Sequence, residues 1–466
     1  MINLYGVFDI RTFGAQPDGE TPSTAAITAA IETCAAAGGG VVYIPAGRFL
    51  TGPLRLKSHV RLHLEAGAHL LFSQDPADYP VLETRWEGKE VLTYAHQIYG
   101  EDLEGVAITG RGTIDGRGET WWRLFRAKAF THPRPRLIAF TRCKDILIEG
   151  VTLVNSPAWT INPVMCERVT IDKVTIINPP DSPNTDGIDP DSSRNVYITN
   201  CYIDVGDDCI AIKAGREDSL YRTPCENIVI ANCLMRHGHG GVVIGSETSG
   251  GIRKVVITNC IFEDTDRGIR LKSRRGRGGF VEDLRATNII MEKVLCPFVL
   301  NMYYDTGGGV IDERAHDLEP HPVSEATPSF RRLSFSHITA REVQAAAAFL
   351  YGLPEQPLED VLFDDIWIEL AADASPARPA MMRAVPPMSQ GGVLCYGARR
   401  ISFRHMHLRG HRGPAFQIER AEAVQLMGCS TDGSEDPQLV LGQAEEVTIR
   451  DCTFTAQQDP AKERQN

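Results

Sequence analysis

Hydrophobic and polar residues alternate along most of the chain in short runs, which are separated by Gly and Pro. Segments such as VVYIP (41–45), LRLKSHVRLHLEAGAHLLF (54–72) and GVAITGRGTIDG (105–116) are rich in β-branched residues. They have the period of two that is typical of strands. We therefore expect an all-β fold.

One segment near the N-terminus departs from this pattern. Thr24–Ala37 is rich in Ala and predicts a helix, with Ser23 at its N-cap and Gly38 at its end. A short aromatic stretch at 121–128 is the only other helical candidate. The apolar face of the first helix comprises Ile27, Ile31 and Cys34.

A repeat begins near residue 136 and decides the fold class. Each copy is a strand, a bend of one or two residues and a second strand, with a period of about 23 to 40 residues. Clear copies are CKDILIEGVTL (143–153), CERVTIDKVTI (166–176), SRNVYITNCYI (193–203), CENIVIANCLM (225–235) and IRKVVITNCIF (252–262). This period suits one coil of a right-handed parallel β-helix. The N-terminal helix then caps the open end of the solenoid.

The register of the copies supports this interpretation. Asn200, Asn232 and Asn259 occupy one phase, and the cysteine that follows each of them occupies the next. We expect stacked asparagines at the bend and an internal column of cysteines. The alternative is a sandwich of unrelated strands, but a sandwich does not repeat one dipeptide at one phase.

This organisation predicts three segments. Residues 1–40 hold an N-terminal strand and the capping helix, residues 41–456 form the β-helix that carries the chemistry, and residues 457–466 form a flexible tail.

Composition and charge exclude several classes. The formal net charge is −12, which argues against a nucleic-acid partner because phosphate contacts need a basic surface. No apolar run reaches the length of a membrane span, and no signal peptide is visible, so we expect a cytoplasmic protein without a membrane partner. The twelve cysteines are then expected to be buried thiols.

Four polar clusters lie between residues 184 and 272. They are Asn184-Thr185-Asp186-Gly187, Gly206-Asp207-Asp208-Cys209, Gly238-His239-Gly240 and Arg270-Leu271-Lys272. The interval from Asp207 to His239 equals that from Asn200 to Asn232. Asp186 and Lys272 stand at equal distances from the strand residues Val169 and Val255. Since neighbouring rungs lie about 4.8 Å apart, we expect the clusters to converge on one patch.

Such a patch suits glycoside hydrolysis. The reaction needs an acid that protonates the leaving oxygen and a carboxylate that activates water or attacks directly. Three carboxylates close together cannot all ionise cheaply, so one should keep its proton near neutral pH. Arg270 and Lys272 add positive charge on an acidic protein, which favours an anionic sugar such as a hexuronate. The glycines beside each cluster would let a polymer approach the backbone.

Each cluster alone has a simpler explanation. An Asp-Asp pair is usually a turn, a His between glycines is more often a turn residue than a catalyst, and an Arg-x-Lys strand usually faces solvent. The joint spacing over consecutive coils is what favours a site.

The motifs NTDG, GDDC, GHG and R-x-K, in this order, resemble those of the polygalacturonases, glycoside hydrolase family 28. The resemblance runs from FGAQPDG (13–19) to the last repeats. It implies that Asp207 is the general acid, that Asp186 and Asp208 hold the attacking water, and that the anomeric centre inverts. It also implies support of the acid by His239, and a galacturonate site at Arg270, Lys272, Asn184 and either Tyr303 or Tyr304. Leu271 stands where Ile is commoner in the family.

Extra segments bear on the mode of cleavage. Residues 78–100 and 301–331 could wall off the substrate path, with Arg85, Trp86, Glu87, His96 and Trp159 as candidate contacts. The text FLYGLPEQPLEDV (349–361) resembles bacterial exo-acting or rhamnogalacturonan-directed members. We therefore expect exo-hydrolysis of α-linked galacturonic acid in pectic oligosaccharides, with trimming of rhamnogalacturonan fragments as the alternative.

Two other classes compete with this hypothesis. A pectate lyase shares the fold and the substrate but eliminates, typically with Ca²⁺, and aspartate oxygens are ligands that Ca²⁺ prefers. A non-catalytic β-helix, such as a tailspike or adhesin module, would bind carbohydrate without cleaving it. We expect neither a cofactor nor a metal, and the sequence leaves the oligomeric state open.

Overall fold

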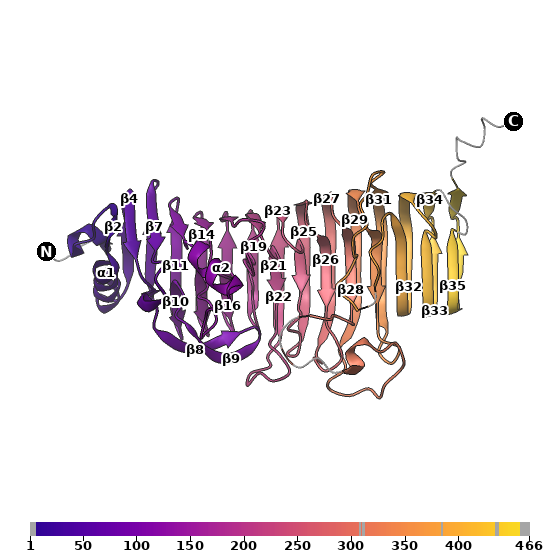
Figure 1. Cartoon of the computed structure of the whole chain (residues 1–466), viewed down its shortest axis with the longest axis horizontal. Helices are drawn as coiled ribbons and strands as arrows, with labels where there is room; N and C mark the ends of the chain where they lie inside the picture. The colour runs from indigo at the N-terminus through magenta and orange to yellow at the C-terminus, as the bar shows by residue number, and fades with distance from the viewer. Residues whose placement is uncertain (1–5, 307–308, 310–312, 384, 434–437, 457–466) are drawn as a thin grey trace. The chain divides into compact units, whose positions relative to one another are not determined.

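The computed structural model describes residues 6–306, 309, 313–383, 385–433 and 438–456. The chain divides into two compact units, Met1–Lys213 with Ser219–Leu234 and Ala214–Asp218 with Met235–Asn466. Strands dominate each unit (Figure 1), which confirms the all-β prediction. In the described part of the chain, no helix has both the length and the apolar character that a membrane span requires.

The first unit is built from three parallel sheets, in which each strand pairs with its equivalent one coil away. One sheet contains β1 (Val7–Asp9), β3 (Gly40–Ile44), β6 (Val60–Leu64), β11 (Glu104–Gly110), β14 (Lys144–Glu149), β17 (Glu167–Asp172), β19 (Arg194–Thr199) and β22 (Cys225–Ala231). The second contains β2 (Asp18–Pro22), β4 (Gly47–Thr51), β7 (Ala68–Phe72), β12 (Thr113–Asp115), β15 (Thr152–Val154), β18 (Thr175–Ile177) and β20 (Tyr202–Val205). The third contains β5 (Leu54–Arg55), β10 (Ile98–Glu101), β13 (Ile138–Thr141), β16 (Ile161–Val164) and β21 (Ile210–Ile212), with bridges at Ile188 and Asp191 between the last two. This is the predicted parallel β-helix.

In-register stacking concentrates like residues in the core. One inward column of the third sheet consists of isoleucine on five successive coils from β10 to β21, and all five side chains are buried. Burial of one such side chain stabilises a fold by about 1.5–3 kcal/mol. The stack therefore holds the outward residues of the same strands in a fixed register. Its members are Ile98, Ile138, Ile161, Ile188 and Ile210.

The N-terminal helix forms as predicted. α1 (Thr24–Ala36) buries Ile27, Ile31 and Cys34 and packs against β1, β3, β5 and β6, so it covers the first coil. Ser23 stands at the N-cap position, but its side chain makes no cap hydrogen bond. Its hydroxyl instead accepts a hydrogen bond from the Gln16 backbone N–H.

Three smaller helices and one hairpin interrupt the coils of the first unit. η1 (Ile10–Phe13) and η2 (Pro76–Asp78) are short 3-10 turns. The aromatic stretch forms α2 (Glu119–Arg126), which buries two tryptophans. β8 (Val81–Trp86) and β9 (Lys89–Tyr94) form an antiparallel hairpin, which occupies the predicted insertion.

The second unit also consists of repeated coils, but many of its strands are longer. In these coils the strand continues through the bend that separates two strands in the first unit. The elements of the second unit are β23 (Leu234–His237), β24 (Val242–Ile244), β25 (Ile252–Glu263), β26 (Arg267–Lys272), β27 (Phe280–Glu292), β28 (Cys296–Asn301), η3 (Glu313–His316), β29 (Ser329–Val343), β30 (Ala346–Tyr351), β31 (Leu358–Leu370), β32 (Gly391–His411), β33 (Phe416–Met427), β34 (Ser430–Gly433), β35 (Leu439–Glu445), β36 (Thr448–Arg450) and β37 (Thr453–Ala456). Parallel pairing again joins each coil to the next.

The asparagines bend the chain as predicted. Asn200, Asn232 and Asn259 have φ values of 57°, 58° and 56°, in the left-handed region that Asn tolerates better than most residues. Within the first unit the Asn232 amide donates to Asn200 Oδ1 at 3.2 Å. Within the second unit Asn288 donates to Asn259 Oδ1 at 2.7 Å.

The cysteines also behave as predicted. None of the twelve forms a disulfide, and all except Cys452 are buried. The residues that follow the bend asparagines, Cys201, Cys233 and Cys260, point into the core. The prediction of one catalytic segment over residues 41–456 stays a prediction, and the tail predicted at 457–466 lies outside the described residues.

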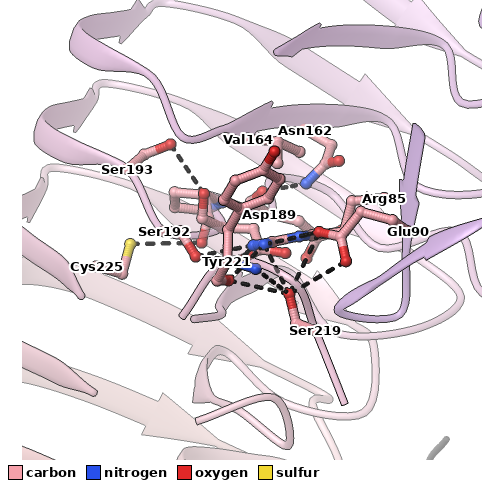
Figure 2. Close-up of polar contacts among 12 residues, drawn as sticks. Arg85, Glu90, Asn162, Val164, Asp189, Ser192, Ser193, Ser219, Tyr221 and Cys225 are labelled. Carbon is pink, nitrogen blue, oxygen red and sulfur yellow. Dashed lines mark hydrogen bonds and ion pairs between the residues drawn. The ribbon is translucent and has the colours of Figure 1, made fainter. Parts of the chain in front are cut away.

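Arg85 fastens the β8–β9 hairpin to the third sheet (Figure 2). Its guanidinium is 1% exposed and lies 3.1 Å from Asp191 Oδ1 and 3.0 Å from Glu90 Oε1. It also donates to the Ser192 and Ser219 hydroxyls and to the Tyr221 carbonyl. Every donor of the fork is therefore used inside the protein.

We predict that Arg85→Met destabilises the protein by about 3–5 kcal/mol, because it removes the buried cation that pairs with the Asp191 carboxylate. The midpoint of urea unfolding measures the change. Arg11→Met is the matched control, since Arg11 is 56% exposed and pairs with Asp9 at the surface. An exposed pair contributes at most about 1 kcal/mol. Equal shifts for the two variants would contradict the assigned anchor.

Candidate functional site

Two turns of the first unit bring three aspartates together. Asp186 lies between β18 and the bridge at Ile188, and Asp207 and Asp208 lie between β20 and β21. The Gly187 N–H donates to the Asp208 carbonyl at 3.0 Å, so Asp186 and Asp208 stand on adjacent rungs. One oxygen from each of the three aspartates lies within 4.8 Å of the others.

The glycines beside the aspartates serve the backbone. A Cβ on Gly187 would stand 2.4 Å from the Cys209 carbonyl oxygen, and one on Gly206 would stand 2.5 Å from that of Ser182. No side chain fits at such distances. These glycines thus allow the close approach of neighbouring coils, and the expectation that they also admit a polymer stays a prediction.

Burial controls the charge state of the cluster. Asp186 and Asp208 are 3% and 1% exposed, whereas Asp207 is only partly buried. Burial, followed by the charges of Asp189 and Asp207, raises the pKa of Asp186 well above its usual range. Because these groups titrate together, the raised pKa belongs to the cluster. Burial therefore favours the protonated form within the cluster, which is the direction that a site with an acid requires.

Sequence reasoning missed two charged residues beside the aspartates. Asp189 is fully buried, and neither of its carboxyl oxygens has a hydrogen-bond partner among the described residues. Burial raises its pKa, against the lowering effect of Lys213. Lys213 Nζ lies 3.9 Å from Asp186 Oδ2 and 4.7 Å from the centre of the Trp159 ring. Lys213 is therefore a buried cation within reach of the carboxyl cluster.

A signal for both residues exists in the sequence. Asp189 directly follows the buried Ile188, and Lys213 directly follows β21, whose residues Ile210–Ile212 are all apolar. Outward charges so close to the NTDG and GDDC motifs mark the floor of a site. A search for motifs alone passes over them.

Trp159 precedes Asp186 by one coil, since the Thr160 N–H donates to the Asp186 carbonyl. Trp86, at the end of β8, stacks on Trp159 with ring centres 5.1 Å apart and an angle of 10°. The Arg136 guanidinium lies 5.3 Å and 4.8 Å from the two rings. The stack forms a wall on the N-terminal side of the aspartates.

Asn184 and Arg134 extend this wall. Arg134 donates to Asn184 Oδ1 at 2.7 Å, and burial lowers the pKa of its guanidinium to about 10, so it stays charged at neutral pH. Both residues, with Trp86 and Glu87, line a pocket of about 420 Å³. The candidate contacts Trp86, Glu87 and Asn184 therefore share one cavity.

Two candidate contacts have other partners. Arg85 is the anchor described above, so its donors are not directed at a ligand. His96 is buried, and its Nδ1 accepts a hydrogen bond from the Arg136 N–H. Burial lowers the pKa of His96, so it is a neutral residue under the wall.

The second unit carries the cationic cluster. His239 is half exposed, and its Nδ1 lies 2.8 Å from Asp266 Oδ2. Although burial works against it, the hydrogen bond with His239 lowers the pKa of Asp266, so Asp266 is a carboxylate that orients the imidazole. Arg270 Nη1 lies 3.4 Å from the His239 carbonyl. Asp266 is another residue that the motif search missed.

The structure separates the two tyrosines. The Tyr304 ring lies 5.6 Å from the Arg270 guanidinium and 5.4 Å from Lys272 Nζ. Tyr303 is fully buried and lies under Arg275. Tyr304 is therefore the tyrosine of the cationic cluster.

One expectation about phase was wrong. Asp186 precedes the strand position at Ile188 by two residues, whereas Lys272 is the last residue of β26. The two residues do not hold equivalent places in their coils, because the turns differ in length. The convergence of the aspartates with His239, Arg270 and Lys272 stays a prediction.

Comparison with known proteins agrees with this chemistry. The family model described as "Glycosyl hydrolases family 28" matches residues 34–371. A probable polygalacturonase of Vitis vinifera is 35% identical over 78% of this chain and 74% of its own. An endo-polygalacturonase of Pectobacterium carotovorum subsp. carotovorum is 33% identical over 62% and 73%.

Solved structures show the same fold. An exopolygalacturonase from Thermotoga maritima superposes with a TM-score of 0.70 and 31% identity, over 85% of this chain and 91% of its own. A match over more than half of the chain, on a parallel β-helix with clustered aspartates, assigns the protein: the chain belongs to glycosyl hydrolases family 28.

Proposed function

We propose that the protein hydrolyses α-linked galacturonic acid residues from the end of pectic oligosaccharides. The wall beside the aspartates carries the exo-acting part of this proposal. An endo-enzyme needs a cleft that is open on both sides of the reacting bond. Here Trp86 and Trp159 stand directly on one side of Asp186, and Arg85 holds the hairpin in place. A wall at this position suits the end of a chain.

The names of the relatives divide on this point. The Thermotoga maritima protein is called an exopolygalacturonase, and the Pectobacterium protein is called an endo-polygalacturonase. Both names support galacturonan as the substrate. The hairpin is the feature of this chain that favours the exo mode.

In the proposed mechanism, Asp207 is the general acid. It is the most accessible of the three aspartates, so its proton can reach the glycosidic oxygen. Asp186 and Asp208 hold the attacking water, and Lys213 compensates the charge of Asp186. The resemblance to the family further implies that Asn184, Arg270, Lys272 and a tyrosine, which we take to be Tyr304, bind the sugar. It also implies that His239, whose imidazole Asp266 orients, supports the acid.

The spacing of the carboxyl groups bears on whether the reaction inverts or retains the configuration at the anomeric carbon. The oxygens lie within 4.8 Å, whereas most inverting enzymes separate acid and base by roughly 6.5–9.5 Å. Spacing alone favours retention, while the resemblance to the family implies inversion. We propose inversion, because two buried carboxylates on adjacent rungs can hold one water between them. NMR of the fresh product decides between the two, and an initial anomer of unchanged configuration would overturn inversion.

We predict that Asp207→Asn lowers kcat on polygalacturonate by about 10²–10⁴-fold, since an amide cannot supply the proton. Asp145→Asn, an exposed site on β14, is the matched control and should keep full activity. Excess EDTA should leave hydrolysis unchanged. Products that absorb as unsaturated uronides and vanish with EDTA would instead identify a Ca²⁺-dependent lyase.

We predict that the first products from polygalacturonate and oligogalacturonides are one short sugar of constant length. Trp86→Ala should open the wall and add longer products at early times. Leu92→Ala, on the same hairpin and 53% exposed, should not. Chromatography of products over time, with rhamnogalacturonan as a second substrate, measures this. A ladder of lengths from the unmodified protein would contradict the exo mode.

We predict that Lys213→Met moves the acidic limb of the kcat/KM profile to higher pH. Lys213 lowers the pKa of Asp186, so its removal raises that pKa. The carboxylate that holds water then forms only at higher pH. Lys213→Arg should keep the parent profile, and Lys173→Met, at an exposed site, serves as the control. An unchanged acidic limb in Lys213→Met would exclude this role.

A further inference from the structure

An exposed aromatic pair lies on the outer face of the second unit. Trp367 on β31 is 46% exposed, although it is the largest side chain in its row. His407 on β32 is its cross-strand neighbour. The two rings stack with centres 4.0 Å apart and an angle of 28°. Together they form a flat platform two strands wide.

The platform forms the floor of a pocket. A cavity of about 400 Å³ opens over Thr339, Trp367 and His407, and its other side chains include Arg341, Glu369 and Arg409. Since the register places Thr339, Trp367 and His407 on three successive strands, the floor spans roughly 10 Å. Cavities of this size lie within the range that proteins use for small ligands.

The charges at the rim are unusual for this protein. The guanidinium groups of Arg341 and Arg409 make no hydrogen bond and no ion pair with the residues that the structure describes. Other exposed arginines on the same two strands pair with an acid, as Arg332 on β29 does with Asp283 and Arg400 on β32 does with Asp360. The lining residues include two guanidinium groups and one carboxyl group, that of Glu369, on a chain of net charge −12. Two further acids, Glu292 and Asp432, are cross-strand neighbours of Arg341 and Arg409 outside the lining.

The imidazole does not add to this charge. His407 Nδ1 lies 2.6 Å from the Ser430 hydroxyl. Burial, helped by His405 and Arg409, lowers the pKa of His407. Near neutral pH the imidazole is therefore neutral, and it presents an aromatic face beside the indole.

We propose that this pocket binds a uronic-acid segment of a polysaccharide, at a place separate from the aspartates of the first unit. The C–H face of a pyranose ring can stack on Trp367 and His407, because an amphipathic aromatic surface holds an apolar face while its rim stays wet. Arg341 and Arg409 can each bind a carboxylate through their forks. Glu369 can accept a hydrogen bond from a sugar hydroxyl.

The charge pattern selects this occupant. Two guanidinium groups without an ion-pair partner among the described residues favour an anionic ligand over a neutral sugar. A nucleic acid is disfavoured because its phosphates would be repelled by the net negative charge of the chain. A uronan offers a ring to stack and a carboxylate on every residue. The choice of galacturonan rests on the proposed function, and a second site for the same polymer would keep a long chain near the enzyme.

The test compares binding by proteins that share the Asp207→Asn change, so that the polymer is not consumed. In affinity electrophoresis with polygalacturonate in the gel, Trp367→Ala should raise the apparent Kd about tenfold. The double variant Arg341→Gln and Arg409→Gln should do the same. Ile290→Ala, on the same row of the sheet and 48% exposed, is the matched control and should bind as the parent does.

Activity supplies the second measurement, with Asp207 intact. Trp367→Ala should raise KM for polygalacturonate about threefold or more and leave kcat/KM for trigalacturonate unchanged. On highly methyl-esterified pectin, which lacks most carboxylates, the difference in Kd between the parent and the double variant Arg341→Gln and Arg409→Gln should disappear.

Three results would overturn this proposal. They are an equal Kd for Trp367→Ala and its parent, an equal loss of affinity by the arginine double variant on esterified pectin, and a dimer in light scattering that Trp367→Ala abolishes without a change in Kd. The last would identify a self-association face. A failure of the proposed function looks different, because the unmodified protein would then not hydrolyse polygalacturonate at all.

Discussion

The in-register hydrogen bonding of parallel strands is the constraint on which the rest of the structure depends. Because each coil pairs residue for residue with the next, a position in one coil determines which side chains lie above and below it. The isoleucine stack from Ile98 to Ile210 shows this in the core. The same register, on the outer side, sets Trp159 beside Asp186 and Asp186 beside Asp208. A site made from distant sequence segments is thus a direct result of regular pairing.

Register also explains how the carboxyl cluster is tolerated. Buried carboxylates repel each other, and each loses the solvation of water. Lys213 offsets part of that cost for Asp186 and Asp189, and the rest appears as raised pKa values. The shift favours the protonated form of part of this cluster, in which oxygens of three aspartates lie within 4.8 Å of one another. For a hydrolase of this family, the coexistence of acid and base forms is the chemical requirement.

An insertion between the regular coils supplies one wall of the candidate site. The β8–β9 hairpin is an antiparallel element in a parallel fold, and Arg85 ties it to Asp191 through buried contacts. Trp86, the last residue of β8, stacks on Trp159 and completes the wall beside the aspartates. The platform of Trp367 and His407 is different, since it uses the sheet itself as a binding surface. The aspartates therefore lie beside a wall that an insertion builds, whereas the proposed second binding surface is part of the regular sheet.

Sequence alone determined the repeat, and with it the fold, the bends at Asn200, Asn232 and Asn259, and the buried thiols, because each is a local pattern copied from coil to coil. It also marked Asp186, Asp207 and Asp208 through their motifs. Tertiary structure decided the rest. It turned Arg85 from a sugar contact into an anchor, chose Tyr304 over Tyr303, and brought Asp189, Lys213 and Asp266 into the sites. It also separated the coil positions of Asp186 and Lys272. The reason is physical: periodicity fixes which face a residue occupies, but turn lengths and long-range packing fix what it meets there.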